Sequence, residues 1–194
     1  MKTNYNLIMK QQISNLTGKP SLLLHVCCAP CSSAVIQKLN EYFNITLFYF
    51  NPNTYPESEY NLRFEQFEKL TNLQIIKCEY NHHQFLNEII GLEQNKEGGY
   101  RCQKCIALRL KQSFKYAKDN GFDFVTTTLS ISPHKDAEFI NSIGQQFQKQ
   151  YGVKYLYADF KKDNGYLNSI NLSKQFNLYR QDYCGCEFSF NDKK

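Results

Sequence analysis

The 194-residue sequence contains no tryptophan, and no apolar run in it approaches the ~20 residues that a membrane-spanning helix needs. Residues 1–19 also lack the apolar core of a secretory signal peptide. These absences predict a cytoplasmic protein without a membrane segment. In that reducing compartment, the eight cysteines favour metal or redox chemistry over structural disulfides.

Two nucleotide-binding signatures are missing as well. The sequence has neither the Gly-x-Gly-x-x-Gly fingerprint of dinucleotide-binding proteins nor the Gly-x-x-x-x-Gly-Lys-Ser/Thr loop of ATP-binding proteins. Nicotinamide, flavin and ATP therefore have no support in the sequence. The net charge of +5 is mild and by itself is weak evidence for an anionic partner.

What the chain does contain is a regular alternation of strand and helix signals. Its hydrophobic fraction of 42% is that of a globular protein, and its length suits a single domain. Strand patterns fall on residues 21–26, 45–50, 73–78, 122–129 and 153–158. Helix patterns fall on residues 31–43, 57–70, 82–90, 105–120 (closed by Gly121), from Ser132 and Pro133 onward, and 167–177.

Strands that are apolar on both faces suit a parallel sheet covered by helices. The pattern predicts one Rossmann-like, doubly wound α/β domain over residues 1–194, with a mostly parallel sheet of about five strands. Residues 1–20 are expected to form an N-terminal arm or helix, residues 21–160 the α/β core, and residues 161–194 a C-terminal tail.

Three of the cysteines stand within five residues, at Cys27, Cys28 and Cys31, directly after the first predicted strand. Pro30 suits the first turn of a helix, where its missing N–H costs nothing. The positive end of that helix would favour thiolates, the form of cysteine that binds metals and attacks substrates. The stretch therefore predicts a sulfur-anion site at the end of a strand.

A second pair, Cys102 and Cys105, has the Cys-x-x-Cys spacing that presents two sulfurs to one metal. Together with Cys27 and Cys28 it predicts a site of four thiolates, which suits either tetrahedral zinc or an iron–sulfur cluster. The alternative is that Cys27 and Cys28 are small buried core residues. Cys31 is a fifth thiolate, a ligand of an extra metal or a packing residue.

The tail carries Cys184-Gly185-Cys186, a spacing that can close a small, strained disulfide. A strained disulfide is easily reduced, so the pair favours redox cycling. The alternative is two unpaired thiols. Cys78 has no partner nearby in the sequence and is expected to be buried.

A run of basic residues lies in the helix that follows Cys105. Lys104, Lys111, Lys115 and Lys118 share one face, which either attracts a phosphate backbone or is simply solvated. Tyr166, Tyr179 and Tyr183 either stack on a base or belong to the core. His25 is expected to be a core histidine, while His134 and Asp136 stand where proton transfer or substrate contact is expected.

Several of these motifs, in this order, resemble those of the QueH-type epoxyqueuosine reductases. The resemblance extends from Leu22 to about Phe188. It rests on His25-Val26-Cys27-Cys28-Ala29-Pro30-Cys31-Ser32, Tyr49-Phe50-Asn51-Pro52-Asn53, Arg101-Cys102-Gln103-Lys104-Cys105, Ser130-Ile131-Ser132-Pro133-His134-Lys135, Phe160-Lys161-Lys162 and Leu178-Tyr179-Arg180-Gln181-x-Tyr183-Cys184-Gly185-Cys186.

The resemblance implies a cytoplasmic enzyme that reduces epoxyqueuosine at the wobble position of tRNA to queuosine, served by an unidentified electron donor. It places a [4Fe–4S] cluster on Cys27, Cys28, Cys102 and Cys105 and a redox-active disulfide on Cys184 and Cys186. It also implies an additional iron, for which Cys31 is a candidate ligand although some family members have an aspartate near this position. The implied fold is a Rossmann-like layer of the nucleotide-hydrolase kind.

We further expect His134, Lys135, Arg180 and Tyr183 to contact the substrate. His134, Asp136 and Tyr183 are candidates for the proton donor. Two other classes of function stay open from the residues alone. One is a zinc-stabilised RNA-binding module without catalysis, and the other is a general thiol–disulfide oxidoreductase.

Overall fold

The structure, a computed structural model, describes residues 3–191 and contains one five-stranded sheet whose strands are all parallel. The strands are β1 (Ser21–His25), β2 (Asn44–Tyr49), β3 (Ile75–Lys77), β4 (Phe124–Thr127) and β5 (Lys154–Tyr155). Their order in the sheet is β3-β2-β1-β4-β5. This confirms the predicted Rossmann-like, doubly wound α/β fold.

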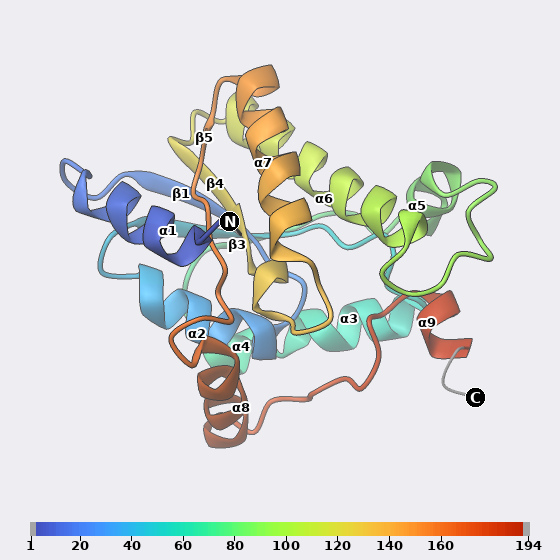
Figure 1. Cartoon of the computed structure of the whole chain (residues 1–194). Coiled ribbons are helices and arrows are strands. Elements are labelled where there is room, and N and C mark those ends of the chain that lie inside the picture. The colour runs from blue at the N-terminus through green and yellow to red at the C-terminus, as the bar shows by residue number, and fades with distance from the viewer. Residues whose placement is uncertain (1–2, 192–194) are drawn as a thin grey trace.

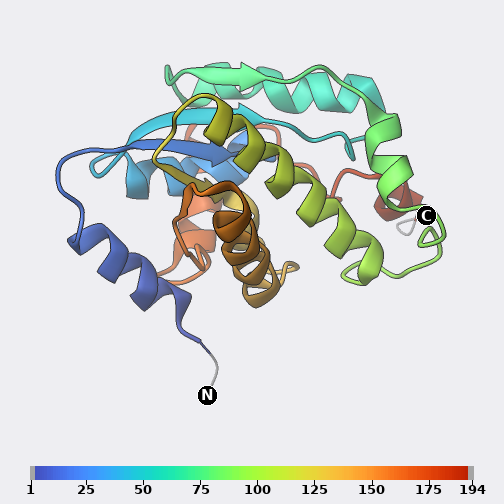
Figure 2. The ribbon, with the colours of Figure 1, turned by 90° about the horizontal axis from the view of Figure 1, so that it is seen from above.

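Helices cover both faces of the sheet (Figures 1 and 2). They are α1 (Tyr5–Ser14), α2 (Ala29–Leu39), α3 (Glu57–Glu65), α4 (Phe67–Leu70), α5 (His82–Glu88), α6 (Tyr100–Asp119), α7 (Ala137–Tyr151), α8 (Gly165–Gln175) and α9 (Glu187–Asn191), with a 3-10 turn, η1, at Thr128–Ile131. Across residues 3–191, no helix combines the length and the apolar character needed to cross a membrane.

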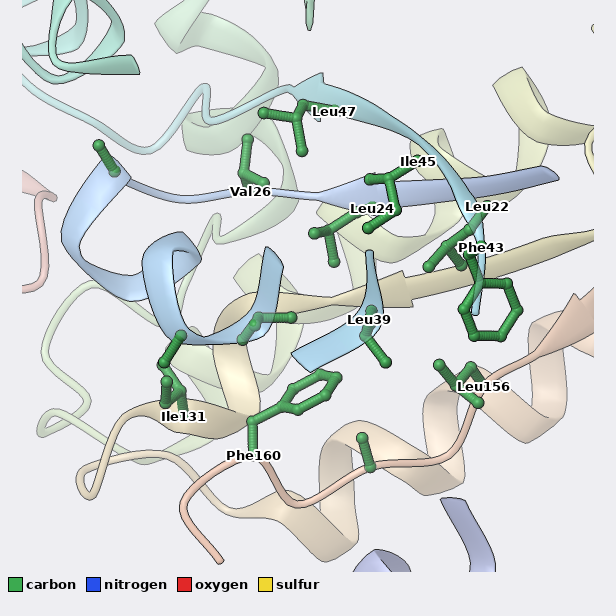
Figure 3. Packing of buried hydrophobic residues seen from close by; sticks show 14 of the residues in the cluster. Leu22, Leu24, Val26, Leu39, Phe43, Ile45, Leu47, Ile131, Leu156 and Phe160 are labelled. Carbon is green, nitrogen blue, oxygen red and sulfur yellow. The ribbon is translucent and has the colours of Figure 1, made fainter. Parts of the chain in front are cut away.

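The core divides into two layers because successive side chains of β1 point to opposite faces. Leu22 and Leu24 pack with α2 and its neighbours (Figure 3), whereas Leu23 packs with α6 and α7 on the other face. On the first face α2 lies against α8, and on the second α6 lies against α7. The two layers bury β1 from Leu22 to His25, which is why three leucines follow one another without a polar residue between them.

Two helix starts differ from the sequence prediction. Helix α6 begins at Tyr100, five residues before the predicted start, so Cys102 and Cys105 lie on its first turns. Helix α7 begins at Ala137 and not near Ser132, because the Asp136 carboxylate accepts a hydrogen bond from the Glu138 N–H (2.9 Å) and caps the helix there.

The remaining differences are local. The predicted helix over residues 57–70 is divided at Gln66 into α3 and α4, and α9 has no counterpart among the predicted elements. Gly121 does close α6 as predicted. It has φ +70°, and the Phe122 N–H donates to the Ala117 carbonyl (2.9 Å) as in a Schellman motif.

Candidate metal and redox site

The candidate site lies where the strand order of the sheet reverses. Strands β1 and β4 are adjacent, and the connections from them run to opposite faces of the sheet, so a crevice opens beyond their carboxyl ends. Cys27 and Cys28 follow β1 directly, and η1 follows β4. The sulfur-bearing turn therefore occupies the position where parallel α/β sheets bind ligands.

The sulfur atoms of Cys27, Cys28 and Cys31 lie within 4.8 Å of one another, and those of Cys27 and Cys28 are 3.8 Å apart. The turn that gathers them is fixed by the Asn51 side chain, whose Nδ2 donates to the Val26 carbonyl (2.9 Å). Cys28 is the N-cap of α2, with an extended backbone, and Cys31 stands on the first turn of that helix. This change from strand to helix aims neighbouring cysteines at one point.

Among the three thiols, Cys27 is the one whose pKa is lowered, so it is the favoured thiolate of the group. Hydrogen bonds from Cys28 and Cys31, with smaller contributions from Thr128 and Arg109, hold the pKa of Cys27 well below its ordinary value despite burial. The bond to Cys27 raises the pKa of Cys28 to about 12, and bonds to Cys27 and Cys28 raise that of Cys31. A group of soft sulfur donors around a favoured thiolate, with Cys28 buried and Cys27 and Cys31 partly exposed to the cavity, fits a thiophilic metal such as zinc or the iron of a cluster.

Cys102 and Cys105 lie in a neighbouring wall of the site. They line a small cavity of about 80 Å³ together with Cys184 and Cys186. Within residues 3–191, the Cys27–Cys28–Cys31 group is the one place where three potential ligand atoms of His, Cys, Asp or Glu come together. The four-thiolate set of Cys27, Cys28, Cys102 and Cys105 thus stays a prediction.

A larger cavity of about 480 Å³ adjoins the small one, and Cys27 and Cys31 line it. The two cavities share the lining residues Glu97, Arg109, His134, Lys135 and Cys184. All four residues predicted to contact substrate, His134, Lys135, Arg180 and Tyr183, line the larger cavity. The structure thus places these residues and three of the predicted sulfur sites around a common space of nucleoside size.

The tail cysteines have different surroundings. The Nζ of Lys135 lies 3.1 Å from the Sγ of Cys184. Burial alone would raise the pKa of Cys184, but the positive charges of Lys135 and Arg109 lower it. Cys186 is buried beside Ser189, and burial raises its pKa. Both cysteines are free thiols in the structure, so the disulfide between them stays a prediction.

Arg109 is a site residue that the sequence patterns did not single out. It is 3% exposed, its Nε donates to the Cys105 carbonyl (3.3 Å), and its Nη1 donates to Asn51 Oδ1 (3.4 Å). Burial opposes its charge, but the surrounding cysteines raise its pKa. Its spacing of four residues from Cys105 puts both on one face of α6. This spacing was the signal in the sequence that could have identified Arg109 as a site residue.

His25 and Cys78 behave as structural residues. His25 is fully buried, with its ring nitrogens 2.8 Å from Thr127 Oγ1 and 3.2 Å from the Phe50 carbonyl oxygen. Its burial and its two partners confirm the predicted core histidine, and burial lowers the pKa of His25 to about 3. Cys78 is partly buried against the core, and burial raises its pKa to about 11.

A parallel sheet with a cysteine cluster at its switch point, facing further thiols and buried cations, defines a Rossmann-like protein equipped for metal and thiol chemistry. The chain belongs to the family described as epoxyqueuosine reductase QueH, whose family model matches residues 22–192.

Curated proteins with that same name are similar over most of the chain. The one from Streptococcus pyogenes serotype M1 is 38% identical over an alignment of 200 positions that covers 97% of this chain and 78% of that protein. The one from Staphylococcus epidermidis is 38% identical over an alignment of 202 positions that covers 97% of this chain and 85% of that protein. The one from Thermotoga maritima is 34% identical over 180 residues, covering 90% of this chain and 92% of that protein.

Proposed function

We propose that the protein is an oxidoreductase that converts epoxyqueuosine at the wobble position of tRNA to queuosine by removing the epoxide oxygen. The observation that carries the proposal is the opening of Cys27, Cys31 and Cys184 onto one cavity of about 480 Å³. A reducible nucleoside in that cavity would meet a potential metal site on one side and an activated thiol on the other. The names of the relatives supply the identity of the nucleoside.

Removal of the epoxide oxygen leaves an alkene and requires two electrons and two protons. The Cys184 and Cys186 thiols supply the two electrons and the two protons when their S–H bonds are lost and a disulfide forms between them. The epoxide oxygen then leaves as water. An external reductant of the thiol or electron-transfer class must then reopen the disulfide for the next turnover. Lys135 lowers the pKa of Cys184 and so favours the reactive thiolate.

A [4Fe–4S] cluster held by Cys27, Cys28, Cys102 and Cys105 is the metal centre of this proposal, with Cys31 as candidate ligand of an additional iron. The fit is supported by the favoured thiolate of the Cys27–Cys28–Cys31 group and by the buried cation Arg109 beside it. When bound, such a group supplies single-electron transfer and a Lewis acid that polarises the epoxide oxygen. His134, at the junction of both cavities, stands where it can deliver a proton.

The tRNA is proposed to lie along α6. Lys104, Lys111, Lys115 and Lys118 are all exposed on this helix, whereas Arg101 and Arg109 of the same helix turn inward. A row of exposed lysines leading to the cavity suits the phosphates of an anticodon arm. An enzyme acting on tRNA in this way would work in the cytoplasm.

The test begins with anaerobic purification and measurement of iron, acid-labile sulfide, zinc and the visible spectrum. We expect about four irons and four sulfides per chain, with iron beyond that at the additional site. Cys102→Ala and Cys105→Ala should lose the chromophore and the reduction of epoxyqueuosine together. Cys184→Ala and Cys186→Ala should lose the activity while keeping the chromophore. Cys78→Ala, outside the site, is the matched control and should keep both.

The alternative functions give different results. One zinc without sulfide, together with tRNA binding but no turnover, would overturn the reductase proposal in favour of a zinc-stabilised RNA-binding module. Reduction of unrelated protein disulfides by a metal-free chain would indicate a general thiol–disulfide oxidoreductase.

A further inference from the structure

Arg63 is a buried guanidinium on α3, a helix that carries none of the cysteines. Its side chain is 2% exposed, and its Nε donates to Glu59 Oε1 at 2.7 Å in an ion pair within the helix. This pair uses one edge of the guanidinium. The two terminal nitrogens remain for contacts elsewhere.

The first terminal nitrogen holds the tail. The Nη1 of Arg63 donates to the carbonyl of Cys184 (3.1 Å), and Cζ lies 5.0 Å from the centre of the Tyr183 ring. The approach is so close that a Cβ at Gly185 would lie 2.8 Å from Nη1. Gly185 also has φ +126°, and its carbonyl accepts from the Tyr55 N–H at 2.8 Å. The glycine between the two tail cysteines therefore permits the contact with Arg63.

The second terminal nitrogen, Nη2, is buried and has no hydrogen-bond partner within the described residues. A buried donor without an acceptor is unfavourable and indicates that an acceptor belongs nearby. Arg63 lines the larger cavity with Cys27 and Cys31. The guanidinium therefore borders the same space as the cysteine group, whose ionised member is Cys27. The acceptor that these surroundings offer is anionic sulfur.

We propose that Arg63 is a positioning residue that ties the redox tail to the sulfur site: Nη1 fixes the backbone of Cys184, and Nη2 donates to the anionic sulfur of the Cys27–Cys28–Cys31 group once the metal centre is occupied. The half of the proposal that concerns the occupied metal centre rests on the proposed function, whereas the half that concerns the tail does not. The consequence is that Cys184 keeps a fixed place relative to the centre while its sulfur faces Lys135.

The experiment uses the full-length, metal-loaded chain and compares four variants. Arg63→Gln removes the charge, Arg63→Lys keeps the charge but loses the forked donor, and Gly185→Ala pushes the loop away while Arg63 stays. Lys77→Gln is the control, because Lys77 contacts α3 through Asn61 (2.8 Å) and the Phe64 ring (4.5 Å). It removes a cation beside the same helix.

Two readouts are independent of substrate turnover. Hydrogen exchange of the Tyr55 amide reports docking of Gly185, and alkylation of the buried Cys186 reports release of the tail. We expect both to accelerate about tenfold or more in Arg63→Gln, Arg63→Lys and Gly185→Ala, because each loses a hydrogen bond made by a charged group. The midpoint potential of the metal centre should fall in Arg63→Gln, since a cation and a donor to sulfur stabilise the reduced form. Lys77→Gln should leave exchange, alkylation and potential unchanged.

Thermal unfolding identifies a variant that fails to fold, in which case Arg63→Lys and Gly185→Ala decide the tail half. Wild-type exchange and alkylation in the folded variants would overturn the tail half, and an unchanged potential in both Arg63 variants would overturn the sulfur half. A chain without any metal would refute the sulfur half together with the proposed metal centre, while the Tyr55 exchange would still decide the tail half. If the protein fails to reduce epoxyqueuosine while the variants still change the exchange rate, the alkylation rate and the potential as expected, the proposed function is refuted and this inference stands.

Discussion

The Nζ of Lys135 lies 3.1 Å from the Sγ of Cys184, so the loop beyond β4 contacts the cysteine pair of the tail. The loop itself is anchored, because the Lys135 carbonyl accepts from Lys161 Nζ (3.4 Å), which also donates to the Ser130 carbonyl (2.9 Å). The anchored loop therefore holds the Lys135 cation beside Cys184. Its positive charge lowers the pKa of Cys184, which burial by itself would raise.

Replacing Lys135 by methionine should make Cys184 less reactive. Loss of the cation raises the pKa of Cys184, so a smaller fraction is thiolate at mildly alkaline pH and alkylation slows several-fold. The measurement is the rate of Cys184 alkylation against pH, resolved by mass spectrometry, and the midpoint should move to higher pH. The exposed Lys162→Met is the control. Equal profiles for all three proteins would show that Lys135 does not set the ionisation of Cys184.

His25 should make the fold sensitive to acid. Burial lowers its pKa from the ordinary 6.5 to about 3, so between these values the unfolded chain binds a proton that the folded chain excludes. The free energy of unfolding should therefore fall as the pH decreases through this window, by up to ~1.4 kcal/mol per pH unit from this residue. Denaturant titrations at several pH values should show a flatter dependence for His25→Gln. The exposed His83→Gln should keep the wild-type slope, and the same slope in His25→Gln would contradict this account.

The parts of the fold that follow from local chemistry were predictable. The apolar run before Cys27 predicts β1, because a strand buried on both faces cannot alternate, and Pro30 predicts the helix start. Helix α7 was misplaced for an equally local reason. Ser132 and Pro133 form a good start signal, but Ser132 instead closes η1 by donating its N–H to the Leu129 carbonyl (3.3 Å), and Asp136 caps the helix.

The candidate site was predictable only in the residues that carry rare chemistry. The sequence shows the candidate site at Cys27, Cys28 and Cys31 by residue type and spacing. In the structure their sulfur atoms lie within 4.8 Å of one another. Arg63 and Arg109 have no such signature, because their roles depend on partners that are distant in the sequence, such as Cys184 for Arg63. The sequence of a basic helix does not distinguish a buried arginine from a solvated lysine, because the packing of the helix on the sheet decides which side chain is buried.

Gly144 should be indispensable for the packing of α7 on the sheet. A Cβ at this position would lie 2.3 Å from the Tyr155 ring, which is buried in β5 and has little room to move. Gly144→Ala should therefore destabilise the fold by about 1–3 kcal/mol, although alanine is the better helix former. The free energy of unfolding from denaturant titration checks this. Gln146→Ala, exposed on the same helix, should be neutral or slightly stabilising, and the same result for Gly144→Ala would mean that α7 can shift.

The exposed lysines of α6 should contribute to tRNA binding through charge alone. Lys104→Gln and Lys111→Gln remove two cations from the outer face of the helix without touching the buried Arg101 and Arg109. Each change should weaken binding and reduce the slope of log affinity against log salt concentration by about one, because each lysine that contacts a phosphate releases counterions. The effect should be similar for tRNAs of different sequence.

The matched control for this experiment is Lys174→Gln, an exposed lysine on α8, which packs with α2 on the opposite face of the sheet. If the tRNA lies along α6, Lys174→Gln keeps the wild-type affinity and salt slope, while Lys104→Gln and Lys111→Gln each bind more weakly with a slope reduced by about one. Equal losses in the α6 and α8 variants would indicate a diffuse attraction by the net charge of +5 and would remove α6 as the binding face. The slope decides between the two because it counts phosphate contacts, whereas affinity alone does not.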